Sequence, residues 1–179
     1  MPLTGCIAFF SMSWMASALD AVEKFELCDG DRVVFLGNSF FERALDYGSL
    51  ETALALRWPD REITFRNLGW DGDTVYGHSR TAGRRHTVFG DPEEGFQRMI
   101  AHLDSLNPTV VFVAYGYNES FDGEAGIKRF ANGWHRLVDA VRPSRTNRRI
   151  VVLSPTPMEE GFGASVQHVA AHNAMMRSY

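Results

Sequence analysis

The sequence predicts an α/β protein with a parallel sheet and helices on both faces of that sheet. Short apolar runs typical of buried strands alternate with longer stretches that carry apolar residues at helical spacing. Strands joined through helices in this way form parallel sheets with right-handed crossovers. The length of 179 residues suits one domain with a substantial core, which we expect to begin near Phe25.

The expected elements follow one another from Asp31 onward. Four short apolar runs predict strands, and the first three runs end in glycine: 32–37, 63–69, 109–116 and 149–155. Apolar residues at helical spacing predict helices between and after them: 41–57 (despite Gly48), 95–106, 125–142 and 164–179. The stretch 70–94 is rich in glycine and polar residues, and a loop of that length in a compact domain is usually functional.

Composition excludes several classes of function. The net charge is −4 and no Lys/Arg run stands out, which argues against nucleic acid as a partner. The two cysteines, Cys6 and Cys28, have no second Cys or His at zinc-ligand spacing. Neither a P-loop nor a G-x-G-x-x-G after the first strand is present. We therefore expect no metal and no cofactor, and we interpret Asp71 and Asp73 as solvated carboxylates of a turn.

Residues 1–21 form a candidate signal peptide. A short apolar core from Cys6 to Met15 precedes small residues, as in a secretory leader, although the positive n-region is missing. A misplaced start codon or a short buried helix is the alternative. No stretch approaches the ~20 apolar residues of a spanning helix, so we expect no integral membrane segment. The protein would be secreted or periplasmic with a leader, and cytoplasmic otherwise.

The chemistry is expected at the carboxyl ends of the strands, where open parallel α/β sheets bind ligands. Ser39 follows the first strand and has two interpretations. It fits an S-x-x-E capping box with Glu42, and it also fits a nucleophile at the start of a helix. The backbone N–H groups of Ser39 and Gly72, with the Asn118 amide, would suit the oxyanion of an acyl-transfer intermediate.

Three short blocks resemble a known family. GNS (37–39), NLGWDGDT (67–74) and YGYNES (115–120) are similar to blocks I, II and III of the SGNH, or GDSL-type, hydrolases, a family of esterases and lipases. The longer strings FRNLGWDGDTV and VAYGYNESF resemble a bacterial, often secreted, branch. The resemblance covers roughly residues 25–179.

The resemblance implies a fold and a site. The fold would be a three-layer α/β/α, flavodoxin-like parallel sheet with strand order 2-1-3-4-5. Ser39 would be the nucleophile, and Gly72 and Asn118 would complete the oxyanion hole. We expect substrate contacts from Asn38, Trp70, Tyr117 and Glu119, although Trp70 and Tyr117 equally suit packing between loops.

The sequence departs from the family pattern in two ways. Asn38 and Glu119 stand where the family usually has Asp. No D-x-x-H of block V and no fifth strand are found near the C-terminal end. We interpret the chain as truncated before its catalytic base, with weak or no activity, marginal stability and one exposed sheet edge.

None of the six histidines is an evident replacement for that base. We expect His102 and His135 to face solvent from their helices. His78 and His86 lie in the long loop, which would be able to fold over the site. His168 and His172 are four residues apart and are interpreted as a surface pair.

Two functions from different classes remain. The first is a serine esterase that acts on O-acyl esters, acetyl groups of carbohydrates among them. The second is a non-catalytic or degenerate α/β domain that binds a carbohydrate or another small ligand. Neither the acyl group, the alcohol nor the oligomeric state is readable from the sequence.

Overall fold

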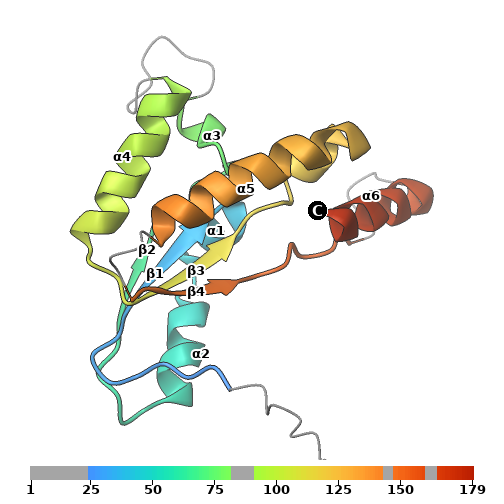
Figure 1. Cartoon of the computed structure of the whole chain (residues 1–179). Helices are drawn as coiled ribbons and strands as arrows, with labels where there is room; N and C mark the ends of the chain where they lie inside the picture. The colour runs from blue at the N-terminus through green and yellow to red at the C-terminus, as the bar shows by residue number, and fades with distance from the viewer. Residues whose placement is uncertain (1–23, 82–90, 143–146, 160–164) are drawn as a thin grey trace, which may run out of the picture.

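The computed structural model describes residues 24–81, 91–142, 147–159 and 165–179. Its sheet has four parallel strands in the order β2-β1-β3-β4 (Figure 1). Their bounds are β1 Arg32–Gly37, β2 Thr64–Asn67, β3 Val110–Ala114 and β4 Arg149–Val152. The α/β fold and the order 2-1-3-4 are therefore confirmed. The candidate signal peptide, residues 1–21, lies outside the described residues.

Helices cover both faces of this sheet. Helices α4 and α5 lie on one face, and α1 and α2 lie on the other (Figure 1). The bounds are α1 Ser39–Ala44, α2 Ser49–Arg57, α3 His78–Thr81, α4 Pro92–Ser105, α5 Ile127–Val141 and α6 Val166–Ser178. Two short 3₁₀ helices precede α5, namely η1 Glu119–Asp122 and η2 Glu124–Gly126. No helix in the described ranges is long and apolar enough to cross a membrane.

The central strands are apolar along their whole length because both of their faces are covered. Val33 of β1 pairs with Phe65 of β2 and with Val110 of β3, and Val110 pairs in turn with Arg149 of β4. Successive side chains of β1 and β3 therefore enter two different cores.

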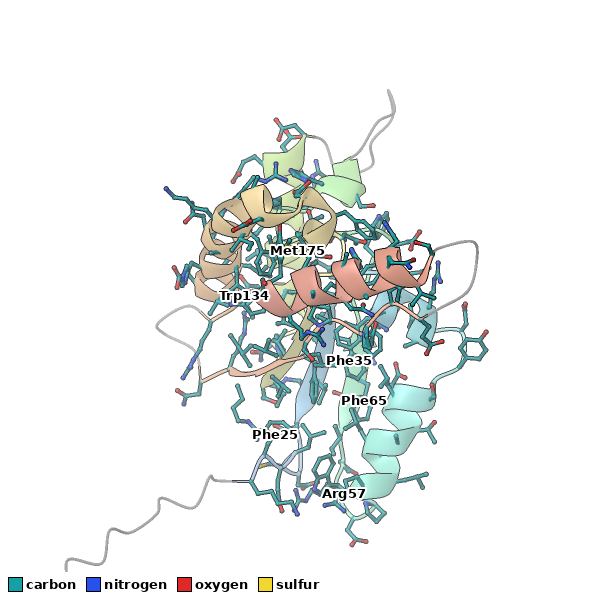
Figure 2. The ribbon with its side chains drawn as sticks, turned by 90° about the vertical axis from the view of Figure 1, so that its right-hand side faces the viewer. Phe25, Phe35, Arg57, Phe65, Trp134 and Met175 are labelled. Atoms are coloured by element: carbon teal, nitrogen blue, oxygen red, sulfur yellow. The ribbon has the colours of Figure 1, made fainter. Side chains whose placement is uncertain are left out.

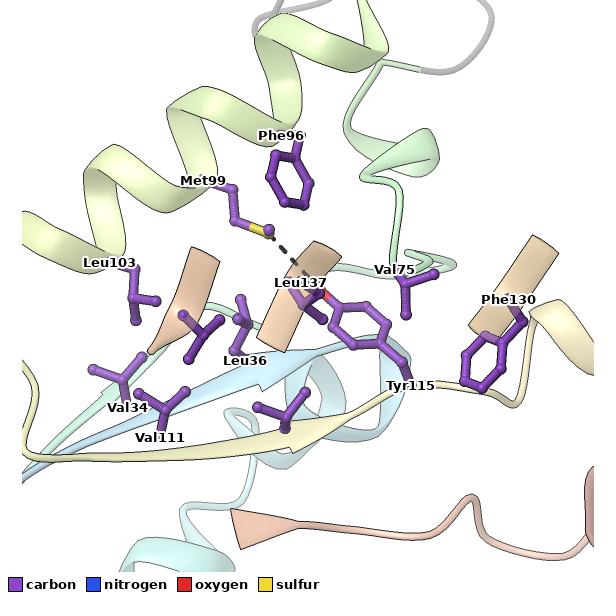
Figure 3. Packing of buried hydrophobic residues seen from close by; sticks show 12 residues of the cluster. Val34, Leu36, Val75, Phe96, Met99, Leu103, Val111, Tyr115, Phe130 and Leu137 are labelled. Carbon is purple, nitrogen blue, oxygen red and sulfur yellow. Dashed lines mark hydrogen bonds between the residues drawn. The ribbon is translucent and has the colours of Figure 1, made fainter. Parts of the chain in front are cut away.

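The core under α4 and α5 takes the even-numbered residues of β1. Val34 and Leu36 pack there with Val111 and Val113 of β3 (Figure 3). The helices close this core with Phe96, Met99, Leu103, Phe130, Leu137 and Val141.

The core under α1 and α2 takes the alternate residues and is largely aromatic. Phe35 stacks on Phe41 of α1 at 5.1 Å and on Phe65 of β2 at 6.0 Å between ring centroids (Figure 2). Phe112 meets Phe35 edge to face. Leu50 and Leu54, two of the apolar residues that predict a helix over 41–57, pack against this core.

The single helix expected over 41–57 is wrong. The chain forms α1, a turn, and then α2, with Gly48 at φ +57° as the residue before α2. Glycine adopts this left-handed conformation without the steric cost of a Cβ atom. Leu45, which has the helical spacing of Leu50 and Leu54 in the sequence, is 53% exposed beside this break.

Asp31 joins three segments at the amino end of the sheet. Its carboxylate accepts hydrogen bonds from the Thr109 hydroxyl at 2.6 Å and from the Cys28 N–H at 2.5 Å, and it pairs with the Arg149 guanidinium. Burial raises the pKa of this carboxyl, but these hydrogen bonds together outweigh burial and hold the pKa below 3.8. The network lies at the end of the sheet opposite Ser39.

Candidate active site

The ends of three strands meet at Ser39. The Gly72 N–H donates to Ser39 Oγ at 2.9 Å. The Asn118 side-chain amide donates to the Asp73 carbonyl oxygen, one residue beyond Gly72, at 2.8 Å. The structure thus brings Ser39, Gly72 and Asn118, the three residues expected at the site, into one cluster of loops.

Asn38, and not Ser39, caps α1. The Asn38 side-chain oxygen accepts from the Phe40 N–H at 3.1 Å, and Ser39 is the first residue of the helix. The S-x-x-E capping box through Glu42 is therefore wrong. Asn38 is 5% exposed, and its side chain caps the start of the helix. The residue also borders the groove described below.

Asn67 and Gly69 set the position of the helix that carries Ser39. The Asn67 amide donates to the Phe41 carbonyl oxygen at 2.7 Å, and its oxygen accepts from the Gly69 N–H at 2.7 Å. A Cβ atom on Gly69 would lie 2.5 Å from the Glu42 backbone nitrogen, so only glycine allows this approach.

The turn after β2 presents Gly72 in the left-handed region, at φ +68°. The Trp70 N–H donates to the Gly37 carbonyl oxygen at 3.0 Å, which ties this turn to the end of β1. The Ser79 hydroxyl closes the turn by donating to the Asp71 carbonyl oxygen at 2.5 Å. The Trp70 side chain is 38% exposed beside these contacts.

The place of Glu119 differs from the substrate-contacting position expected for it. The side chain is 3% exposed, and its two oxygens accept from the Val75 N–H at 2.7 Å and the Gly116 N–H at 2.9 Å. Burial raises the pKa of this carboxyl above 4.5, although the N–H donors act in the opposite direction. Glu119 thus joins the loop after β2 to the turn that bears Asn118.

Asp73 is also buried, which corrects its interpretation as a solvated turn residue. It is 0% exposed, and the Tyr115 hydroxyl donates to its Oδ2 at 3.3 Å. Asp71, in contrast, is exposed as expected. Within the described ranges no group of three or more His, Cys, Asp or Glu side chains is arranged to hold a metal ion.

His172 is buried, so the surface pair expected for His168 and His172 is wrong. The His172 ring stacks on Phe121 at 4.1 Å between centroids and meets Tyr117 edge to face at 5.7 Å. The Ser120 hydroxyl donates to the Tyr117 carbonyl oxygen at 2.6 Å, so it can accept from His172 Nε2–H at 3.3 Å. Burial lowers the pKa of His172 below 6.5, and nearby His168 acts in the same direction.

The other histidines divide as follows. His102 and His135 are exposed, which confirms the expectation for both. His78 begins α3 and stacks on Tyr76 at 5.0 Å between centroids. His86 lies outside the described residues. In the part of the chain that the structure describes, no histidine hydrogen-bonds to Ser39.

A groove of about 820 Å³ runs past Ser39. Tyr117 lines it, together with the segment that follows β4. The α1 wall carries Ser39, Phe40 and Arg43. The groove therefore offers apolar surface, hydroxyl groups and one cationic side chain next to the serine.

Sequence reasoning missed three residues that organise this site: Asn67, Asp73 and His172. Asn67 carries a usable signal, because an Asn at a strand end before glycine is typical of side-chain to backbone bonding. The sequence carries no local signal for the role of His172, because the burial of this residue depends on how α6 packs against η1.

Solved structures share this fold. A gut microbial diltiazem-metabolizing enzyme superposes with a TM-score of 0.58 at 23% identity, over 85% of this chain and 33% of that one. A lipase/acylhydrolase from Enterococcus faecalis gives 0.53 at 14% identity, over 83% and 66%. A psychrotrophic esterase from Pseudoalteromonas sp. gives 0.50 at 14% identity, over 82% and 70%.

These likenesses show the fold, which is one used by hydrolytic enzymes. The chain spans a third of the length of the first structure and just under two thirds of the second. No protein-family model matches the sequence, and no curated protein matches it significantly.

Proposed function

We propose that the protein is a serine ester hydrolase of the SGNH, or GDSL, type that acts on carboxylic O-acyl esters, with acetylated carbohydrates among its substrates. The contact between the Gly72 N–H and Ser39 Oγ carries the proposal. It joins the ends of two strands at a serine that opens onto a groove. A donor so close to the hydroxyl is placed to bind the oxyanion that forms when that hydroxyl attacks an ester.

The roles follow from this arrangement. Ser39 Oγ attacks the ester carbonyl, and the C–O bond to the alcohol breaks, so the alcohol leaves with the hydroxyl proton and an acyl-enzyme remains. Water then hydrolyses the acyl-enzyme, which releases the acid and restores the Ser39 hydroxyl. The N–H groups of Ser39 and Gly72 donate to the carbonyl oxygen as it gains negative charge. The Asn118 amide would add a third donor by exchanging its bond to the Asp73 carbonyl oxygen for one to the oxyanion.

A non-catalytic ligand-binding domain is the second candidate. It is favoured by the lack of a histidine in contact with Ser39 among the described residues, since a serine hydroxyl without a base is a weak nucleophile. The groove beside Ser39 would then bind an ester or a sugar without hydrolysing it.

Hydrolysis of p-nitrophenyl acetate separates the two candidates. We expect a protein-dependent rate in the wild type that Ser39→Ala abolishes and that Ser49→Ala, at the exposed start of α2, leaves unchanged. Equal rates in the wild type and Ser39→Ala would exclude Ser39 as the nucleophile.

A further inference from the structure

Arg43 lies on the groove wall beside Ser39. It follows Ser39 by four residues in α1, so the two side chains share one face of the helix, with Cβ atoms about 5–6 Å apart. Both residues line the same groove, and Arg43 is exposed there. A ligand attached to the serine would therefore pass within reach of the guanidinium.

What distinguishes Arg43 is its place, because it is the arginine that lines this groove. Five other arginines in the part of the chain that the structure describes form ion pairs with carboxylates: Arg61, Arg129, Arg136, Arg148 and Arg149. Arg43 has no such partner among the described residues, although Glu42 is its neighbour in sequence. The charged group that shares the groove with it is the exposed carboxylate of Glu159.

We propose that Arg43 selects ester substrates that carry a carboxylate a few bonds from the ester carbonyl. This inference rests on the proposed function, because it names the substrate class of the same groove. The planar guanidinium binds carboxylates through two parallel N–H···O bonds, which gives it both charge and directional selectivity. The carboxylate would belong to the acyl part, as in a dicarboxylic acid monoester, or to the alcohol part, as in an ester of a hydroxy acid.

Matched ligands test this selectivity without turnover. In a Ser39→Ala background, monomethyl succinate and neutral dimethyl succinate are titrated against the protein, and Kd is obtained from amide chemical shifts. Acetoxyacetate and its methyl ester form the alcohol-side pair. We expect the anion of at least one pair to bind more tightly than its neutral partner. Arg43→Gln should raise the Kd of that anion by roughly three- to ten-fold.

Two further substitutions control the charge argument. Arg57→Gln removes a charge of the same kind at the exposed end of α2, which lies away from α6 (Figure 2), and should leave all Kd values unchanged. Glu159→Gln removes the competing carboxylate from the groove and should tighten binding of the anion. The neutral esters report whether each variant is folded, because their Kd values should not change.

The outcomes separate this proposal from the proposed function. A change limited to one anionic ligand supports the proposal and identifies the side of the ester that carries the charge. The proposal would be overturned if the anion and the neutral ester had equal Kd values in both pairs. It would also be overturned if Arg43→Gln changed the Kd of the anion and the Kd of the neutral ester by the same factor. Ser39-dependent hydrolysis of p-nitrophenyl acetate is measured separately, so either idea can fail while the other stands.

Discussion

The backbone N–H of Gly72 donates a hydrogen bond to the Oγ of Ser39 across 2.9 Å, although the two residues are 33 positions apart. The contact exists because β1 and β2 are parallel neighbours, so their carboxyl ends open at the same edge of the sheet. The loop after each strand needs only a few residues to reach the other. A donor fixed in this way requires little reorganisation when an oxyanion forms beside it.

Gly72→Ala should lower Ser39-dependent ester hydrolysis. An alanine at φ +68° is strained by about 1–2 kcal/mol, and its Cβ would lie 3.2 Å from Ser79 Oγ. Relief of that strain turns the N–H away from Ser39, so we expect kcat/KM for p-nitrophenyl acetate to fall by about ten-fold or more.

Gly30→Ala is the matched control for this substitution. Gly30 also has positive φ, at +77°, but it lies near Asp31 at the opposite end of the sheet, and a Cβ atom added there would have no neighbour within 4 Å. The stability of this variant should fall by a similar amount while kcat/KM stays at the wild-type value. A parallel loss of activity in both variants would mean that strain alone, and not the Gly72 donor, is responsible.

Glu119→Gln should destabilise the fold and loosen the Asn118 turn. Each Glu119 oxygen accepts from one backbone N–H group. A glutamine side chain keeps one acceptor oxygen but places an NH₂ donor where the other oxygen was. The variant leaves a buried N–H donor facing another donor, so we expect the free energy of unfolding in urea to fall by about 1–3 kcal/mol. Glu124→Gln, at an exposed position in η2, should change it by less than about 0.5 kcal/mol.

Much of this fold is predictable because its strands are short and uniformly apolar. Runs such as that around Val111 are typical of strands buried on both faces, and their order along the chain with intervening helices indicates a parallel sheet. The break between α1 and α2 is not predictable from spacing, because Leu50 and Leu54 continue a helical pattern past Gly48. Periodicity alone does not distinguish one long helix from two consecutive ones.

The site is predictable only in part. The rule that ligands bind beyond the strand ends brings Ser39, Gly72 and Asn118 together without knowledge of any distance. The inward turn of Glu119 was not predicted, because nothing local shows whether a carboxylate points toward a groove or toward two backbone N–H groups. That choice is made by packing between segments far apart in sequence.

His172 should make the stability depend on pH. Its pKa is lowered by burial between the rings of Tyr117 and Phe121, with Ser120 as its polar partner and His168 as the nearby charge. Between the folded pKa and pH 6.5 the unfolded chain therefore binds more protons at this imidazole than the folded chain does. The contribution of His172 is intact above 6.5, and the free energy of unfolding falls as the pH is lowered through 6.5 toward the folded pKa.

A comparison with His172→Gln isolates this effect. Urea denaturation of both proteins at about pH 7.5 and about pH 5.5, on either side of the unfolded pKa, should show a larger loss of stability in the wild type, because glutamine does not titrate. His135→Gln, on the exposed side of α5, should keep the wild-type pH dependence. Identical pH dependence in the wild type and His172→Gln would show that the imidazole titrates freely and that α6 does not pack on η1 as described.

Asp31→Asn should lower stability and leave the site untouched. The carboxylate accepts from Thr109 and Cys28 and pairs with Arg149, and an asparagine cannot reproduce both the charge and all of these acceptors. We expect the free energy of unfolding to fall by about 1–3 kcal/mol near neutral pH. Because the folded pKa lies below 3.8, this contribution is present above that pH and is lost as the pH falls through the folded value. The difference in stability between the wild type and the variant should therefore shrink on acidification.

Asp60→Asn, at an exposed turn, is the control for Asp31→Asn and should leave the stability unchanged. The kcat/KM for p-nitrophenyl acetate should be the same in the wild type and both variants, because the Asp31 network lies at the far end of the sheet from Ser39. A large loss of activity in Asp31→Asn at a pH where it is fully folded would mean that the two ends of the sheet are coupled. Such coupling would contradict the independence of the two ends that we expect from their separation by the paired strands β1 and β3.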